Sequence, residues 1–140
     1  MGFLFGGAAG RGRTARTDTR AQGDAAEAQA VAWLERRGLR LVQRNYRTPG
    51  RGGGEIDAIM RAPDGTLVFV EVRLRHDGLH GGAAASIGPI KQRRLILAAQ
   101  HFLASCARLP ACRFDVMAGQ PDAAGHLQWE WLQAAFDASL

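Results

Sequence analysis

The order of apolar and polar residues along the chain predicts helices at two places. From about Gly23, apolar residues recur at helical spacing, which indicates a helix with one buried stripe, and Gly38 is the kind of residue that ends such a helix. A second stretch with the same spacing runs from Pro89 to about Cys106. Each helix presents one apolar face, so each is expected to pack on a sheet.

The remaining pattern predicts strands. The run from Leu67 to Val72 is almost continuously apolar, which is typical of a central strand covered on both faces. Strands are expected over residues 39–46, 55–61, 67–74 and 112–117, and the alternation of Leu127, Trp129 and Trp131 suggests a fifth. The order α-β-β-β-α-β therefore predicts an α/β domain with a mixed β-sheet flanked by helices.

The segment between the second and third strands predicts their register. In Ala62-Pro63-Asp64-Gly65-Thr66, proline presets the first turn position and glycine accepts the left-handed conformation that closes a three-residue loop. Ala62 then faces Thr66, which sets Asp57 opposite Glu71 and Glu55 opposite Arg73, all on one face.

A different turn would remove this cluster. A two-residue Asp64-Gly65 turn shifts the register by one position and sends Asp57 and Glu71 to opposite faces.

Asp57 and Glu71 repel each other in this register, and a buried carboxylate without a partner costs several kcal/mol. A positive group must therefore lie between them. Arg73 is one solution, as a structural ion pair. A divalent cation held by two carboxylates and water is the other, and Mg²⁺ uses such sparse sites.

The basic character of the chain is concentrated at its start. The formal net charge is +5, and residues 1–22 contribute +3 of it through four arginines and one aspartate. This segment has no apolar periodicity, so it is expected to be a disordered basic tail ahead of one domain over residues 23–140. The tail either lies on a phosphate backbone or is a solvated, dispensable extension.

Cysteine usage and hydropathy exclude several classes of protein. Cys106 and Cys112 are too few for a disulfide scaffold, and their spacing does not fit a zinc hairpin. No apolar stretch approaches the roughly 20 residues that cross a bilayer. The first ten residues also lack the features of a secretory signal. We therefore expect a cytoplasmic protein with no membrane partner.

Several short motifs occur in a defined order. Gly54-Glu55-Ile56-Asp57 precedes the hairpin, and Val68-Phe69-Val70-Glu71-Val72-Arg73 follows it. Together they resemble the YraN family of small uncharacterised bacterial proteins. Further matches, over about residues 23–137, are Gly23 to Glu27, Arg44-Asn45-Tyr46-Arg47, Lys91, Arg113-Phe114-Asp115-Val116 and Ala134-Ala135-Phe136. The ordered set is specific, whereas one tetrapeptide alone is weak.

That family is similar to the PD-(D/E)XK nuclease superfamily and to archaeal Holliday-junction resolvases. The resemblance implies a restriction-endonuclease-like core in which Asp57 and Glu71 bind Mg²⁺ or Mn²⁺, with the main-chain carbonyl of Val72 as a further ligand. It also implies that Glu27 approaches this site from the first helix. Junction-cleaving relatives would imply a homodimer.

Position 73 departs from the superfamily pattern, which has lysine two residues after the glutamate. The lysine helps orient or activate the attacking water, whereas Arg73 stabilises charge on a phosphate but stays protonated and cannot act as a base. The chain contains 17 arginines and a single lysine, so a general bias toward arginine also explains the exchange. Catalysis by the ordinary route is therefore in question.

Basic residues at the start of the second helix suggest a phosphate site. Lys91 and Arg94 lie where positive charge opposes the helix macrodipole, and a bound phosphate would reverse that cost. We expect Lys91, Arg75 and Arg94 to contact nucleic acid, with a merely solvated basic patch as the alternative.

Three other acids have structural interpretations. Asp24-Ala25-Ala26-Glu27 fits a capping box, so Glu27 either serves the start of the helix or belongs to the metal site. Glu55 is expected to pair with Arg73 or solvent. Asp115 is expected to anchor Arg113 or a neighbouring strand.

Three functions follow from these residues. The first is an endonuclease that hydrolyses phosphodiester bonds in DNA with water as the nucleophile. The second is a non-catalytic nucleic-acid-binding protein of the same fold, inactivated by Arg73. The third is a protein-interaction domain whose acid cluster is structural. DNA and RNA are not distinguished, because no base-reading element is evident.

Overall fold

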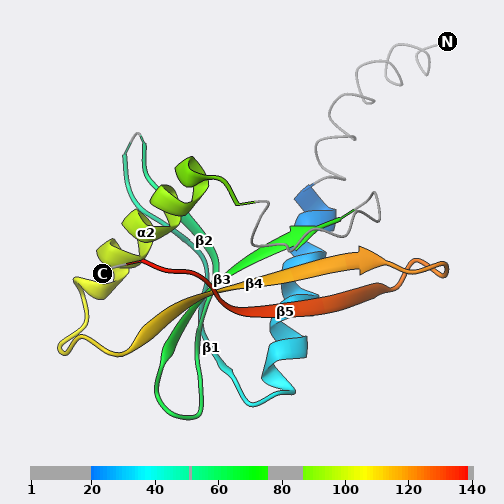
Figure 1. The fold of residues 1–140 in the computed structure, drawn as a ribbon, viewed down its shortest axis with the longest axis horizontal. Helices are drawn as coiled ribbons and strands as arrows, with labels where there is room; N and C mark the ends of the chain where they lie inside the picture. Colours follow the sequence, from blue (N-terminus) through cyan, green and yellow to red (C-terminus); the bar gives the residue numbers. More distant parts are fainter. Residues whose placement is uncertain (1–19, 51, 76–86, 139–140) are drawn as a thin grey trace, which may run out of the picture.

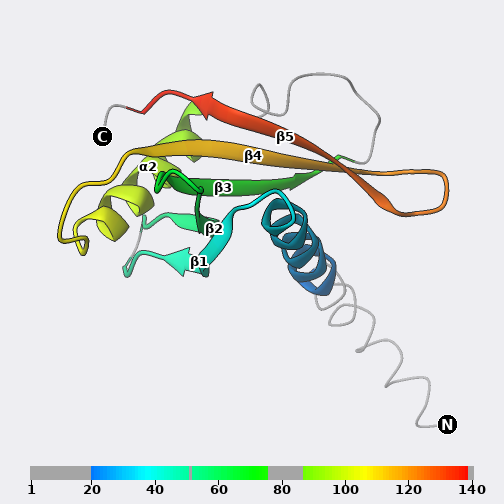
Figure 2. The same cartoon turned by 90° about the horizontal axis from the view of Figure 1, so that it is seen from below.

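The described part of the chain forms one five-stranded mixed sheet with a helix on each face (Figures 1 and 2). The computed structural model describes residues 20–50, 52–75 and 87–138. The strands follow one another across the sheet in the order β1-β2-β3-β4-β5, and only β3 and β4 run parallel. Their bounds are Arg40–Arg47 for β1, Glu55–Arg61 for β2, Leu67–Leu74 for β3, Cys112–Pro121 for β4 and Leu127–Phe136 for β5.

Two helices accompany the sheet in these described ranges. The described part of the N-terminal helix covers residues 20–35. The second helix, α2, covers Pro89–Leu103 and lies between the parallel strands β3 and β4 in the chain. The resulting order, α-β-β-β-α-β-β, is consistent with a restriction-endonuclease-like fold and confirms the predicted fold class. No helix in the described parts of the chain is long and apolar enough to traverse a bilayer.

The sheet separates two apolar cores. On one face Leu67 and Phe69 of β3 pack with Leu95 of α2, and on the other Val68 and Val70 pack with the N-terminal helix. All four of these β3 side chains are at most 1% exposed. The continuous apolar run of β3 thus has the predicted cause, since alternate residues enter different cores.

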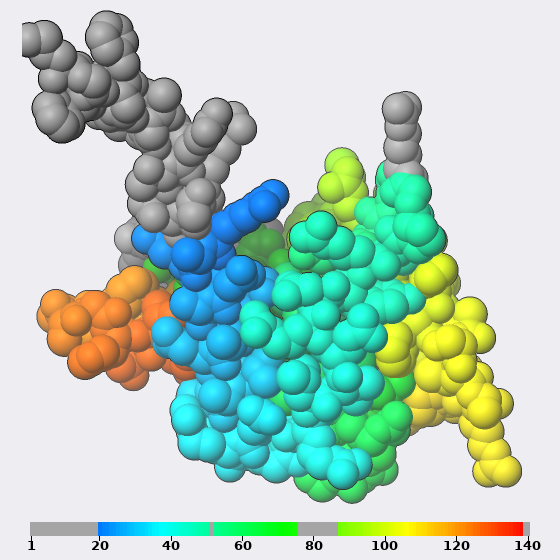
Figure 3. Space-filling model, turned by 180° about the vertical axis from the view of Figure 1, so that it is seen from behind, coloured from blue at the N-terminus to red at the C-terminus, as the bar shows by residue number. Residues whose placement is uncertain are grey.

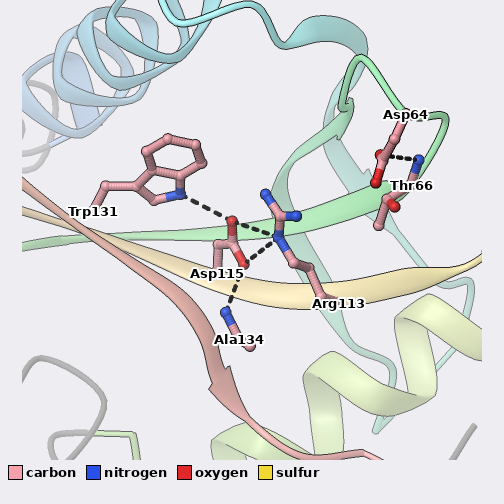
Figure 4. Close-up of polar contacts among 6 residues, drawn as sticks. All are labelled: Asp64, Thr66, Arg113, Asp115, Trp131 and Ala134. Carbon is pink, nitrogen blue, oxygen red and sulfur yellow. Dashed lines mark hydrogen bonds and ion pairs between the residues drawn. The ribbon is translucent and has the colours of Figure 1, made fainter.

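The turn between β2 and β3 is the three-residue loop that the sequence predicts. Ala62 and Thr66 face each other, the amide of Gly65 donates to the Ala62 carbonyl at 2.9 Å, and Gly65 has a φ of 93°. Asp64 accepts a hydrogen bond from the Thr66 amide (Figure 4). The strand pairs run from Arg61–Leu67 to Ala58–Val70, so the predicted register is confirmed as far as this pairing extends.

The N-terminal helix begins earlier than expected. Residues 20–22 and Gly23 are already helical, whereas the sequence places them in the tail or at the helix start. The remainder of the predicted tail, residues 1–19, lies outside the described residues. At the other end Gly38 has a φ of 97°, and the amide of Leu39 bonds the carbonyl of Leu34 at 3.2 Å. This is the predicted glycine C-terminus.

The C-terminal strands extend further than the sequence suggests. β4 continues to Pro121, and the fifth strand is a full partner of it, so that the two form a long hairpin (Figure 1). By contrast, α2 is shorter than predicted, since it ends at Leu103 rather than near Cys106. The two cysteines are free and half-buried.

Asp115 joins β4 to β5 where their register shifts. Its carboxylate accepts from the side chain of Arg113 at 3.1 Å, from the indole of Trp131 at 2.9 Å and from the amide of Ala134 at 3.0 Å (Figure 4). Ala134 has a φ of 48° at this irregularity. The predicted anchoring role of Asp115 is confirmed.

Candidate functional site

Asp57 lies where β2 turns its side chains from one core to the other. Ile56 packs in the core beneath α2 and Ala58 in the core beneath the N-terminal helix, although residues two apart share a face in a regular strand. In the neighbouring strand β1, Arg44 pairs with Ala58 and Tyr46 pairs with Ile56, so Asn45 lies beside Asp57. Asn45 has a φ of 52°. Asp57 is therefore displaced from the ordinary alternation.

The side chain of Asp57 turns toward β3. The β2–β3 pairing ends at Ala58–Val70, so Asp57 lies just beyond the last pair. The Oδ2 atom of Asp57 accepts a hydrogen bond of 2.8 Å from the amide of Val72. A carboxylate thus takes up a main-chain donor beyond the end of the ladder. This contact holds Asp57 beside the segment that carries Glu71.

Glu71 is a buried acid on the face of β3 that α2 covers. The residue is 7% exposed, and its Oε1 lies 3.5 Å from the ammonium nitrogen of Lys91 in the first turn of α2. Its Oε2 is buried and has no hydrogen-bond partner. The positive group that the sequence requires beside Glu71 is thus Lys91, and the predicted structural pairing with Arg73 is not the contact found.

Glu27 reaches the same place from the N-terminal helix. Its carboxyl group lies close to that of Asp57, whose charge raises the pKa of Glu27, and its Oε2 lies 3.4 Å from the guanidinium of Arg44 on β1. The capping-box interpretation is wrong, because the helix already includes residues 20–26 and Glu27 lies inside it. Glu27 does approach Asp57 from the N-terminal helix, and its part in a metal site stays a prediction.

Burial makes these three acids hard to ionise together. Loss of solvent, and then the charge of Asp57, raise the pKa of Glu27 and that of Glu71 to about 7. Burial also raises the pKa of Asp57, against the hydrogen bond from Val72 and the charge of Lys91. Fully ionised, the cluster carries more negative charge than Lys91 and Arg44 balance.

The carboxylate oxygens of Asp57 and Glu71 are of the kind that a hard divalent cation takes as ligands. Such ions bind through one or two carboxylates, carbonyl oxygens and water, and the orphaned Oε2 of Glu71 is an acceptor of this kind. Among residues 20–50, 52–75 and 87–138, no group of three or more His, Cys, Asp or Glu side chains is arranged to hold a metal. The donor set is therefore sparse, and water and the Val72 carbonyl would have to complete it.

The other predicted residues lie around this cluster. Arg73 lies two residues after Glu71 on β3. The charge of Arg73 lowers the pKa of Glu71, but less than the charge of Lys91 does. Arg75 directly follows the last residue of β3, and its amide donates a hydrogen bond of 2.8 Å to the carbonyl of Gly119. Arg94 is exposed and lines a hollow of about 460 Å³ beside α2. Glu55 pairs with Arg47, at 3.6 Å, rather than with Arg73.

Arg44 is the site residue that sequence reasoning missed. Its guanidinium bonds Glu27 and, at 3.2 Å, the carbonyl of Asp24, which fastens the N-terminal helix to β1. The only available signal was its place in the motif Arg44-Asn45-Tyr46-Arg47, which does not reveal a partner 17 residues earlier.

Comparisons with known proteins agree with the resemblance. Residues 26–118 match the sequence profile described as "Uncharacterised protein family UPF0102". A UPF0102 protein of Paracidovorax citrulli (strain AAC00-1) is 57% identical over 139 residues, 99% of each chain. Another, of Albidiferax ferrireducens, is 63% identical over 116 residues, which are 83% of this chain and 87% of that one.

A third relative, the UPF0102 protein of Polaromonas naphthalenivorans (strain CJ2), is 58% identical over 125 residues, 86% of this chain and 82% of its own. The matched segment contains Glu27, Asp57, Glu71 and Lys91, the four residues that the structure brings together. None of these names states an activity. The chain belongs to the UPF0102 family, also called the YraN family.

Proposed function

We propose that this protein is a metal-dependent endonuclease that hydrolyses phosphodiester bonds in DNA. The observation that carries the proposal is the unpartnered, buried Oε2 of Glu71 next to Asp57. A protein that needed these acids only for its stability would satisfy both oxygens, because an unmade buried hydrogen bond costs about 1–3 kcal/mol.

Asp57 and Glu71 would hold Mg²⁺ or Mn²⁺ together with the carbonyl of Val72. When bound, the ion supplies charge neutralisation at the phosphate and a water of lowered pKa. The Val72 amide fixes the rotamer of Asp57 through its 2.8 Å hydrogen bond, so one oxygen of Asp57 is oriented before any ligand arrives. Glu27, with its pKa raised to about 7, exchanges a proton near neutral pH.

Lys91 supplies the ammonium group that position 73 lacks. Its Nζ lies 3.5 Å from Glu71 and its side chain is 42% exposed, so the ammonium group can contact the attacking water or a phosphate oxygen without leaving the site. A lysine exchanges protons more readily than an arginine when its surroundings change. We assign to Lys91 the water-orienting role, and to Arg73 the stabilisation of phosphate charge.

A second function is favoured by one observation, the arginine at position 73. If Lys91 cannot replace the missing lysine, the same surface would bind nucleic acid and the ion without turnover. The protein would then show salt-sensitive affinity for DNA and no cleavage.

The test is cleavage of duplex, single-stranded and branched DNA by the full chain with Mg²⁺, with Mn²⁺ and with a chelator. We expect cleavage that needs the ion and falls at least about a hundredfold in Asp57→Asn. Asp64→Asn, which removes a carboxylate from the exposed turn, is the matched control and should retain full activity. Cleavage by Asp57→Asn at the wild-type rate would contradict the proposal.

Two further variants test the lysine assignment. Lys91→Met should lose at least about tenfold in cleavage rate, and Arg73→Lys should raise the rate by restoring a second ammonium group. Undiminished cleavage by Lys91→Met would refute the role assigned to Lys91. An unchanged or lower rate in Arg73→Lys would refute our account of position 73.

A further inference from the structure

A hollow of about 420 Å³ lies between the N-terminal helix and the start of β5. Figure 3 shows the β4–β5 hairpin, in orange, beside the blue N-terminal helix. The hollow is outside the carboxylate cluster, since none of Glu27, Asp57 and Glu71 lines it. Its chemically distinctive lining consists of Gln29, Trp33, Arg36, Arg37, Gln128 and Trp129.

The two tryptophans of the hollow are held in place. Trp33 meets the ring of Trp131 edge to face at a centroid distance of 6.0 Å, and the guanidinium of Arg37 lies 3.2 Å over the Trp33 ring. Trp129 lies on the main chain of Gly119, where a Cβ atom would come within 2.7 Å of the ring. Rigid aromatic rings lose little conformational entropy when a ligand packs on them.

The charge of the hollow is positive. Arg36 and Arg37 line it, both are exposed, and no aspartate or glutamate is among its lining residues. The amide of Gln128 is oriented by a 3.1 Å hydrogen bond to Asp122, which leaves its carbonyl oxygen as an acceptor. A ligand that fits this lining has a flat polar ring system and an anionic group.

We propose that this hollow binds a nucleotide of a single-stranded nucleic acid, with the base packed on Trp129 and the phosphate held by Arg36 and Arg37. Single-strand binding proteins combine these two features, aromatic rings for the bases and arginines for the backbone. A duplex does not fit this chemistry, because its bases are already stacked and paired.

The position of the hollow suits a substrate strand of the proposed nuclease, and to that extent the inference rests on the proposed function. Glu27 and Trp33 are six residues apart on one helix, about 9 Å along its axis. The hollow thus lies within about two helical turns of Glu27. The substrate class that follows is DNA or RNA with a single-stranded segment.

Intrinsic fluorescence offers a direct test. The chain has three tryptophans, Trp33, Trp129 and Trp131, and all belong to this region. Oligothymidylate is titrated into the full chain in a chelator, so that cleavage cannot contribute. We expect the fluorescence to be quenched on binding, with weaker binding at higher salt. A duplex of equal length and free thymidine monophosphate should quench much less.

Two variants locate the binding. Arg36→Gln changes an exposed side chain and should weaken the binding of oligothymidylate about tenfold, and Trp129→Ala by a similar factor. Arg108→Gln removes another exposed arginine outside the hollow and is the control, with affinity within about twofold of wild type. If Trp129→Ala does not fold, Arg36→Gln still decides the question.

The outcomes separate this inference from the proposed function. Absence of quenching, or equal affinities for Arg36→Gln and Arg108→Gln, overturns the nucleotide site even if ion-dependent cleavage of duplex DNA is observed. Quenching that Arg36→Gln weakens supports the site even if no substrate is cleaved. Equal quenching by the duplex would overturn the preference for a single strand.

Discussion

Two buried carboxylates on adjacent strands of this sheet are treated in opposite ways. Asp115 on β4 is 1% exposed and accepts hydrogen bonds from Arg113, Trp131 and Ala134. Glu71 on β3 is 7% exposed, and it has one cation at 3.5 Å and one oxygen with no partner. Burial alone therefore does not show whether the fold satisfies both oxygens of an acid.

The two acids differ in the number of hydrogen-bond donors that surround their carboxylate oxygens. Asp115 receives donors at both oxygens and joins two strands at a register shift, which makes it a part of the fold. Glu71 faces Asp57, which is itself deprived of solvent, so the protein stores repulsion there. This imbalance is the reason why we propose a positive ligand at this place.

The largest effect on stability is expected at Asp115. Asp115→Asn replaces an acceptor by a group that is partly a donor, among donors that remain buried, and should lower the free energy of unfolding by about 3 kcal/mol. Urea denaturation measures this loss, and added Mg²⁺ should not restore it. A loss below about 1 kcal/mol would mean that the two carboxylates are less different than proposed.

The pH dependence of stability without metal is the next largest effect. The folded state raises the pKa values of Glu27 and Glu71 from 4.5 to about 7, so between these values it binds more protons than the unfolded chain. Stability should therefore fall as the pH rises through this window, by the order of 2 kcal/mol. Denaturation at several pH values in a chelator would reveal it. In Asp57→Asn the fall should be smaller, and an equal fall would show that the charge of Asp57 is not one of its causes.

Glu71→Gln should have the opposite sign to Asp115→Asn. Above pH 7 and without metal, removal of the unbalanced charge should stabilise the protein by about 1 kcal/mol, at the cost of its response to Mn²⁺. Thermal unfolding of both variants in one buffer makes the comparison. A destabilisation as large as that of Asp115→Asn would show that Glu71 is a structural acid too.

The smallest effect is expected for an ion pair outside both regions. Arg47 and Glu55 are 73% and 42% exposed at their side chains and lie 3.6 Å apart. Arg47→Ala should change the free energy of unfolding by less than about 0.5 kcal/mol, because water and salt screen exposed pairs. A larger change would indicate that unfolding measurements in this protein report more than the local contacts.

Most of the sheet could be predicted because its determinants are local. The turn at Pro63-Asp64-Gly65 sets the register of β2 and β3, and the apolar run of β3 reveals its two-sided burial. The C-terminal hairpin was underestimated at β4, whose extension to Pro121 depends on pairing with a strand that follows later. Local preference does not contain that information.

The sequence indicated which residues form the acid cluster, but not most of the contacts that they make. Asp57 and Glu71 follow from the register, but the bend of β2 at Asp57 depends on two cores and on Asn45 in the next strand. The Lys91–Glu71 pair depends on how the α2 crossover lies on the sheet, which spacing along the chain does not specify. Tertiary packing decides both.

The central claim is that Asp57 and Glu71 share a divalent cation, and the most direct test is calorimetric titration of Mn²⁺ into the metal-free chain above pH 7, where Glu71 is ionised. We predict saturable binding to the wild type and to Asp115→Asn, and its loss in both Asp57→Asn and Glu71→Gln. Equal binding by all four proteins, or none by the wild type, would contradict the account.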